Sequence, residues 1–520
     1  MAQGGTTPLP TEIPGFGPVR PFAGAYAAQG EARRATAKPR SGAGGGKVLP
    51  GLRAAIEACG IRDGATLSFH HHLRNGDGVL NAVLADVAAL GLKGIRVAAS
   101  SIFPVHAPLV EHIRSGVVTG ITTSYVAGPV AEAISAGALA TPAVLQTHGG
   151  RARAIACGDL RIDAAFVAAP AADACGNING VDGRAACGTL GYPAADVRHA
   201  GRVVAVTDTL VPFPNRPIQI AQDQVDHVVP VDTIGDPRQI ASGTTRPTTH
   251  PVGLRIAETA ARVVEASGLL ADGFSFQTGA GGVSLAVASR LADAMARSGV
   301  RGGFAAGGIT GMIVDMLEAG LFRTLLDVQC FDLRAVESFR RNPAHQEMSA
   351  SMYANPHERG AVVDQLDAMI LGAAEVDLDF NVNVATATNG TIIGGSGGSG
   401  GHSDTAAGAK LALVTTRLTA GRYPKIVERV TTVTTPGETV DAVATEAGVA
   451  VNPRRPDLRD RLLSAGIPVV SIEELRGEAE RQCGGEVPRA EGGKVVAVVE
   501  YRDGTVIDVV REVPGRREGA

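Results

Sequence analysis

Short runs of β-branched residues alternate with amphipathic segments along most of this 520-residue chain. In the segment 78–90 the apolar residues recur every three or four positions, which predicts an amphipathic helix. The same patterns predict strands at 95–98, 166–169 and 203–207, and helices at 108–114 and 130–138. Such alternation is typical of βα units that build a largely parallel sheet.

A second series of the same kind begins after residue 253. It predicts a helix at 254–267, a strand at 274–277 and a helix at 283–297, and a Pro-rich irregular stretch at 211–251 precedes it. We therefore expect an α/β fold of two domains, at 47–252 and 253–520, each with an open, mostly parallel sheet.

The two ends of the chain differ from this pattern. Residues 1–46 are rich in Gly, Ala, Pro and Arg without apolar periodicity, so we expect a mobile N-terminal arm. Near the other end, 494–501 and 505–513 flank Asp503-Gly504, which predicts a C-terminal β-hairpin in the second domain.

Composition excludes several classes of function. Lys and Arg number 48 against 52 Asp and Glu, and no basic stretch is interleaved with aromatic residues, so a nucleic-acid partner is not expected. The 6 cysteines are scattered without a C-x-x-C pair, as in proteins of a reducing cytoplasm. No signal peptide or long apolar run is present in the sequence, so we expect a cytoplasmic protein without a membrane partner.

One glycine cluster, FSFQTGAGGV at 274–283, connects a predicted strand to a predicted helix. Glycines at such a turn let backbone N–H groups approach an anion or a developing oxyanion. Ser284 replaces the third glycine of the dinucleotide fingerprint, so NAD binding is disfavoured. A turn that only packs is the alternative.

A second glycine cluster spans 388–404, between a predicted strand at 380–385 and a predicted helix at 405–416. It contains G-x-S-x-G twice, a motif that suggests a serine hydrolase as an alternative. The chain order argues against that class, because the only histidine after Ser396 is His402 on the same loop. A flexible linker is the other alternative.

Three adjacent histidines, at 70–72, follow a strand-like segment and precede Arg74. Neighbouring residues on a strand point to opposite faces, so these histidines alone do not form a metal site. They could bind a carboxylate substrate, with Arg74 as a bidentate partner.

The chain from about residue 48 to 513 resembles the α subunit of citrate lyase, within the CoA-transferase superfamily. The resemblance is carried by SFHHHLRNGDG (68–78), HAPLVEHIRSGVVTGITTS (106–124), GYPAADV (191–197), QDQVD (222–226), FSFQTGAGGVSLAV (274–287), GGIT (307–310), LLDVQCFD (325–332), FNVNV (380–384) and VVAVVEYRDGTVIDVV (495–510).

The resemblance implies two related α/β domains with the active site between them. It also implies a transferase: citrate displaces acetate from an acetyl thioester on an acyl-carrier (γ) subunit, and a separate β subunit cleaves the citryl thioester. The thiol belongs to a CoA-derived prosthetic group on the carrier, so this chain itself needs no bound cofactor or metal. A hetero-oligomer is expected.

The resemblance also suggests roles for individual residues. It makes the backbone N–H groups of Gly281 and Gly282 candidates for the oxyanion hole. Thioester contacts are expected from Gly279, Ala280, Asn389 and Gly390, with the Asn389 loop facing the first glycine turn. Since citrate carries three carboxylates, its candidate ligands are His70, His71, Arg74 and Arg246.

One departure from the superfamily concerns the nucleophile. Many CoA transferases have a glutamate before an Asn-Gly pair, and the position before Asn389-Gly390 is Thr388 here. Direct exchange without a glutamyl-enzyme intermediate is therefore expected. Another CoA transferase or acyl-CoA hydrolase that uses free CoA thioesters, and a non-catalytic scaffold for the carrier and lyase subunits, remain alternatives.

Overall fold

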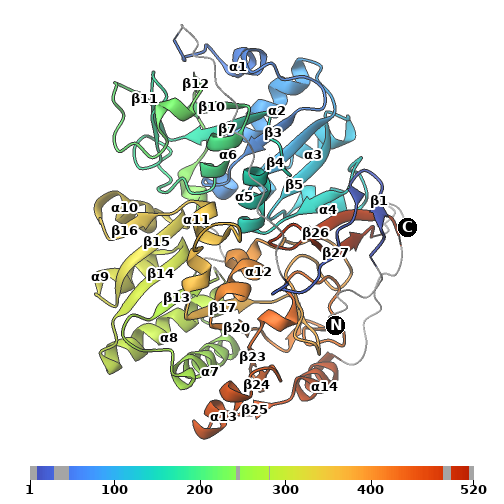
Figure 1. Cartoon of the computed structure of the whole chain (residues 1–520), viewed down its shortest axis with the longest axis vertical. Helices are drawn as coiled ribbons and strands as arrows, with labels where there is room; N and C mark the ends of the chain where they lie inside the picture. The colour runs from blue at the N-terminus through green and yellow to red at the C-terminus, as the bar shows by residue number, and fades with distance from the viewer. Residues whose placement is uncertain (1–8, 28–45, 242–245, 280, 484–492, 514–520) are drawn as a thin grey trace.

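A computed structural model describes residues 9–27, 46–241, 246–279, 281–483 and 493–513. Two nine-stranded sheets form its framework and lie one above the other in Figure 1. Helices α5, α6, α11 and α12 lie between the sheets, where α11 packs against α5 and α6.

The first sheet is parallel except for its last strand. Its strands in spatial order are β12 (His227–Pro230), β10 (Arg202–Thr207), β7 (Ala164–Ala169), β3 (Thr66–Phe69), β4 (Ile95–Ala99), β5 (Val118–Thr123), β6 (Ala143–Leu145), β26 (Val495–Glu500) and β27 (Val506–Arg511). Its helices are α1 (Leu52–Ala58), α2 (Val79–Ala89), α3 (Leu109–Arg114), α4 (Pro129–Ser135), α5 (His148–Cys157) and α6 (Ala194–His199).

The second sheet is parallel except where β23 pairs with β24. Its order is β16 (His345–Glu347), β15 (Phe322–Cys330), β14 (Gly302–Ile309), β13 (Ser275–Thr278), β17 (Ala368–Gly372), β20 (Leu411–Thr415), β23 (Ala442–Thr445), β24 (Gly448–Val451) and β25 (Val469–Val470). Its helices are α7 (Pro251–Ser267), α8 (Gly282–Ser298), α9 (Gly311–Glu318), α10 (Leu333–Arg341), α11 (Ala350–Ala354), α12 (Gly398–Gly408), α13 (Pro456–Ser464) and α14 (Ile472–Cys483).

Apolar burial explains why these segments form βα layers. All six residues of β7, AAFVAA, are buried, as expected for a parallel strand covered on both faces. Helix α2 contacts β7 and buries Val83, Leu84 and Val87 completely. Each such side chain contributes about 1.5–3 kcal/mol of transfer free energy.

The predicted strands at 95–98, 166–169, 203–207 and 274–277 are confirmed. The helices predicted at 78–90, 108–114, 130–138, 254–267 and 283–297 are confirmed as well. The helix predicted at 405–416 is wrong: α12 begins within the glycine run, and residues 411–415 form β20. Small residues let α12 pack closely against β17 and α5, so tertiary packing outweighs their poor helix propensity. The domain boundary near residue 253 falls in the first turn of α7 and stays a prediction.

The chain termini are arranged differently from the sequence-based expectation. The hairpin β26–β27 exists, but β26 pairs with β6, so it extends the first sheet rather than the second. Within the predicted mobile arm, residues 9–22 pack on this hairpin, where Ile13 is buried against Val498, Val506 and Val509. These contacts join segments at opposite ends of the sequence, which no local pattern reveals. The other residues of the predicted arm include 1–8 and 28–45, which lie outside the described residues.

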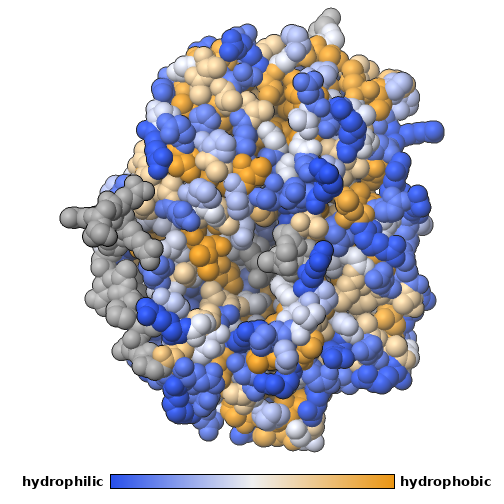
Figure 2. All heavy atoms as spheres, turned by 180° about the vertical axis from the view of Figure 1, so that it is seen from behind, coloured by the Kyte–Doolittle hydropathy of each residue, from blue (hydrophilic) through white to orange (hydrophobic). Residues whose placement is uncertain are grey.

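The back face of the molecule carries hydrophilic residues with separate groups of hydrophobic ones between them (Figure 2). Within the described part of the chain, no helix combines the length and the apolar composition needed to cross a membrane.

Candidate active site between the two domains

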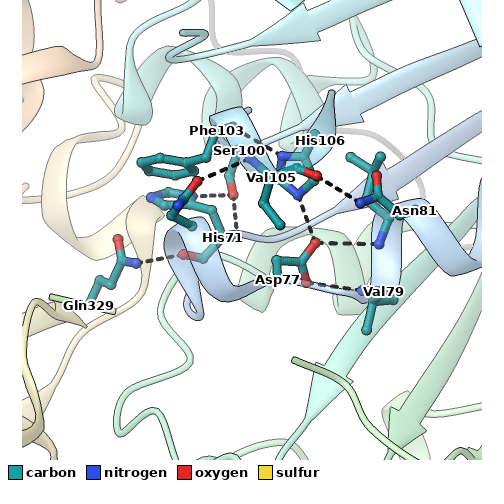
Figure 3. A network of polar contacts seen from close by, with 11 residues as sticks. His71, Asp77, Val79, Asn81, Ser100, Phe103, Val105, His106 and Gln329 are labelled. Carbon is teal, nitrogen blue, oxygen red and sulfur yellow. Dashed lines mark hydrogen bonds and ion pairs between the residues drawn. The ribbon is translucent and has the colours of Figure 1, made fainter. Parts of the chain in front are cut away.

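The carboxyl ends of β3 and β4 meet the second domain near the end of β15. Gln329 of β15 donates a 2.7 Å hydrogen bond from Nε2 to the carbonyl oxygen of His71, which follows β3 (Figure 3). Ligands of open α/β sheets bind at the carboxyl ends of their strands. This junction is therefore the candidate site, with groups supplied by both domains.

His71 is buried among polar and aromatic groups of the first domain. Its Nδ1 lies 2.6 Å from the hydroxyl oxygen of Ser100, which follows β4, and its ring centroid is 4.5 Å from that of Tyr192. Burial, and then the charges of His148 and Arg74, hold the pKa of His71 well below its ordinary value. The imidazole is thus neutral at physiological pH.

A second hydrogen-bond network supports the turn that carries these groups. His106 accepts from the backbone N–H of Phe103 at Nδ1 (3.0 Å), and its Nε2 lies 3.0 Å from Asp77 (Figure 3). Asp77 in turn accepts from the N–H groups of Val79 and Leu80 at the start of α2. The network fixes the loop after β4 against the loop after β3.

Arg74 lies between aromatic rings of the two domains. Its guanidinium carbon is 5.6 Å from the ring centroid of Phe103 in the first domain and 4.5 Å from that of Phe331 in the second. Burial lowers its pKa, an effect opposed by Tyr125 and Tyr192. Arg74 also has a φ of 51°, a left-handed conformation that costs about 1–3 kcal/mol for a non-glycine residue. The surrounding structure therefore holds this cation in a defined position.

His70, also predicted to bind substrate, is engaged elsewhere. Its Nε2 lies 3.1 Å from buried Asp196, which also binds Arg151 at 2.9 Å and accepts from Ser68. Burial raises the pKa of Asp196, but Arg151 and His70 outweigh it, so the pKa lies below its ordinary value. In these contacts His70 anchors the turn that carries His71, and its binding of substrate stays a prediction.

The first glycine turn lies at the start of α8, with Arg246 beside it. Gly281 is the N-cap of α8, and Gly282 accepts a 2.8 Å hydrogen bond from the N–H of Thr248. A β-carbon added at Gly282 would lie 3.2 Å from the carbonyl oxygen of Arg246, whose side chain is exposed. The structure thus brings Gly281, Gly282 and Arg246 together. Gly279 follows β13 and donates its N–H to the carbonyl oxygen of Ile370, and Ala280 lies outside the described residues.

Asn389 and Gly390 have neighbours other than the first glycine turn. Asn389 is exposed and accepts from the N–H of Thr391, and the nearest atom to a β-carbon added at Gly390 belongs to Val513. Nearby, Ile392 donates to Ser135 of the first domain. Among the described residues these contacts do not join the two loops, and the facing arrangement stays a prediction.

The later part of the second glycine cluster contacts the first domain instead. The N–H of Gly397 donates to Ser124 (3.0 Å), and a β-carbon there would be 3.0 Å from the ring of His148. Asp404 of α12 accepts from Thr147 Oγ1 (2.8 Å) and from the N–H of Gly149 (3.0 Å), so it caps α5 across the junction. Burial raises the pKa of Asp404 to about 6.

We expect Asp404→Asn to reduce the pH dependence of stability. A carboxyl group whose pKa is raised in the folded state makes its full contribution to the unfolding free energy below its unfolded pKa of about 3.9. That contribution is lost as the pH rises through about 6. The difference in unfolding free energy between wild type and variant should therefore change between about pH 4 and 6. Denaturant unfolding at several pH values measures it, with exposed Asp63→Asn as control. Parallel pH profiles for wild type and Asp404→Asn would contradict this.

Several site residues were missed by sequence reasoning. Ser100, Phe103 and Tyr192 become site residues only because β4 and the loop before α6 lie beside β3. Gln329 and Phe331 lie in the string LLDVQCFD, which supported the resemblance without assigning them a role. Their side chains contact residues of the first domain, and a single sequence does not reveal such contacts between distant segments.

The two mostly parallel nine-stranded sheets define a CoA-transferase-like α/β fold. The same fold occurs in the malonate decarboxylase alpha subunit from Acinetobacter baumannii, with a TM-score of 0.61, 16% identity, and coverage of 84% of this chain and 93% of that one.

The family model for the citrate lyase alpha subunit matches residues 45–513, and the chain belongs to this family. The citrate lyase alpha chain of Escherichia coli (strain K12) is 50% identical over 467 residues, covering 90% of this chain and 91% of the relative. The structure of a citrate lyase alpha subunit from Streptococcus mutans in complex with citrate has a TM-score of 0.90 and 48% identity, and covers 95% of this chain and 96% of that one.

Proposed function

We propose that this chain transfers the acyl-carrier thiol from an acetyl thioester to citrate, giving a citryl thioester and acetate. Family membership and a relative solved with citrate support this activity. The observation that carries it in this chain is the placement of Arg74 and His71 at the domain junction, where a buried cation and a neutral imidazole can meet a carboxylate and a thioester.

The exchange balances without any other reactant. A citrate carboxylate oxygen attacks the thioester carbonyl carbon, a C–O bond forms, and the C–S bond breaks to release the carrier thiolate. The thiolate then attacks the citryl carbonyl of the mixed anhydride, and acetate leaves. Each attack places negative charge on a carbonyl oxygen, which preorganised N–H donors stabilise.

The partners in this proposal are citrate, the acyl-carrier subunit and the citryl-thioester lyase subunit, in a hetero-oligomer. The CoA-derived group is part of the carrier substrate, and no cofactor or metal is assigned to this chain. A cytoplasmic location belongs to the same proposal, and cell fractionation tests it.

Labelled citrate tests this function. Purified protein is incubated with labelled citrate and either acetylated carrier or acetyl-CoA, and citryl thioester is measured. Product formation with the carrier supports the proposal. Product with acetyl-CoA alone indicates a transferase of free CoA thioesters, hydrolysis indicates an acyl-CoA hydrolase, and carrier binding without turnover indicates a scaffold.

We expect direct exchange, so no glutamyl thioester should accumulate on the protein. The reason is Thr388, which occupies the position before Asn389-Gly390, since a threonine hydroxyl is a poor replacement for a carboxylate nucleophile. Protein incubated with acetylated carrier but no citrate is treated with hydroxylamine or borohydride and analysed by peptide mass spectrometry. A modified glutamate would overturn direct exchange.

We expect Gly281→Val to abolish exchange while the fold is retained. A β-carbon at Gly281 has only Ser284 Oγ nearby, at 3.9 Å, and the φ of −74° suits any residue. The added side chain would instead block approach of the thioester to the N-terminal N–H groups of α8. Gly51→Val, with open space at the start of α1, is the matched control. An unaltered rate for Gly281→Val with a normal melting temperature would remove this loop from the site.

A further inference from the structure

The ring of His71 contacts the hydroxyl group of Ser100. Ser100 follows β4, is completely buried, and its Oγ lies 2.6 Å from His71 Nδ1. The same oxygen is 3.1 Å from the backbone nitrogen of His71, which donates to it. Figure 3 shows both contacts converging on Ser100 from one residue.

Counting protons determines which ring nitrogen of His71 is protonated. A serine hydroxyl has one proton to donate and two lone pairs that accept. One lone pair receives the backbone N–H of His71. Among the described residues, the acceptor in reach of the hydroxyl proton is His71 Nδ1. If Nδ1 carried a proton instead, the buried hydroxyl would have no acceptor in the described part of the chain, at a cost of about 1–3 kcal/mol.

The surroundings of the ring keep it neutral. His148, Arg74, His72 and His70 all disfavour a positive charge on His71, and burial has the largest effect. Tyr192 and Phe103 pack on the ring, and Tyr192 is itself kept protonated by burial. With Nδ1 unprotonated, the single ring proton of a neutral imidazole resides on Nε2.

We propose that Ser100 is a positioning residue that fixes His71 as a neutral Nε2–H donor, and that this N–H binds the thioester carbonyl oxygen as it becomes negative. The assignment to a thioester rests on the function proposed above, whereas the tautomer does not. Neutral imidazole is a known type of electrophilic donor at carbonyl groups.

A neutral donor suits this site better than an imidazolium. A second full positive charge beside Arg74 would bind the carboxylates of citrate strongly in the ground state, and uniform binding does not accelerate the chemical step. The interaction of a neutral N–H group with the carbonyl oxygen instead strengthens most when negative charge develops on that oxygen. Arg74 and His71 thus divide ground-state binding and transition-state stabilisation between them.

Nitrogen NMR of the wild-type protein tests the tautomer without any activity assay. Protein labelled with ¹⁵N-histidine is recorded from about one unit below to two units above the ordinary histidine pKa of about 6.5, and His71→Gln assigns the signals. We expect Nδ1 to remain of the unprotonated, pyridine-like type and Nε2 of the protonated, pyrrole-like type throughout. A protonated Nδ1, or a ring that titrates in this range, would overturn the proposal.

Kinetics of paired serine variants test the positioning role. Ser100→Ala removes the hydroxyl that selects the tautomer, so we expect mixed tautomers by NMR and kcat lower by about 10- to 100-fold, with the KM for citrate little changed. Ser100→Thr retains the hydroxyl and should recover most of kcat. Ser101→Ala is the matched control, because Ser101 Oγ donates to the carbonyl of Ser100 and does not reach the ring.

The two proposals fail in different ways. If wild type shows the Nε2–H tautomer but no exchange activity, the proposed function is wrong and the tautomer assignment stands. If Ser100→Ala retains both the wild-type tautomer and the wild-type kcat, the positioning role of Ser100 is wrong even when exchange is present. Should Ser100→Ala not fold, the wild-type NMR result and the Ser100→Thr kinetics decide.

Discussion

Arg74→Met is expected to raise the KM for citrate by about 10- to 150-fold, the equivalent of a charged hydrogen bond of about 1.5–3 kcal/mol. The methionine side chain can occupy the space between Phe103 and Phe331, so the aromatic packing is retained while the cation is lost. Because Arg74 is expected to bind the substrate carboxylate in the ground state and in the transition state alike, kcat should fall much less than kcat/KM. Steady-state kinetics with acetylated carrier measure both constants.

Arg334→Met is the matched control for this substitution. Arg334 pairs with Asp315 and Glu318 on the surface of the second domain, where ion pairs contribute about 0–1 kcal/mol. Arg74→Lys adds a further comparison, since it keeps the charge and loses the planar bidentate donor. A KM for citrate in Arg74→Met equal to that of wild type would show that another group binds the carboxylates.

His71→Phe is expected to lower kcat by about 10²- to 10³-fold, the typical cost of losing an oxyanion donor. Phenylalanine preserves the ring packing against Tyr192 and His148 but has no N–H to offer. The hydroxyl of Ser100 loses its acceptor, so the unfolding free energy should also fall by about 1–3 kcal/mol. Single-turnover rates and denaturant unfolding separate the two effects.

His72→Gln serves as the control for His71→Phe. His72 belongs to the same histidine string, but its Nε2 lies 3.0 Å from the carbonyl of Ala168, within the first domain. We expect a loss of stability with little change in kcat. A His71→Phe variant that is destabilised yet retains the wild-type kcat would assign His71 a structural role only.

The βα pattern predicted much of the fold because its periodicity is local. The apolar spacing at 78–90 determines which face of α2 is buried, and the continuous apolar run of β7 matches a strand covered on both faces. Long-range pairing was not predictable in the same way. The hairpin β26–β27 has a clear turn signal, yet its place beside β6 depends on which sheet edge is available.

The glycine cluster at 394–401 shows where local reasoning failed. Its composition predicts a loop, but α12 begins there because the absence of side chains allows close contact with Ser124 and the ring of His148. Asp404 then reaches the start of α5 from the second domain. Helix propensity reflects interactions between residues that are close in the sequence, whereas this packing joins residues of two domains.

The sequence by itself determined the α/β class, the family resemblance, and His71 and Arg74 as candidates for binding an anionic substrate. Only the tertiary structure separated His70, held by Asp196, from His71, held by Ser100, although the two residues are adjacent in the chain. The physical reason is that successive residues leave a strand end in different directions. Each ring therefore meets its own partners, and those partners, drawn from distant segments and from the second domain, determine its protonation and its role.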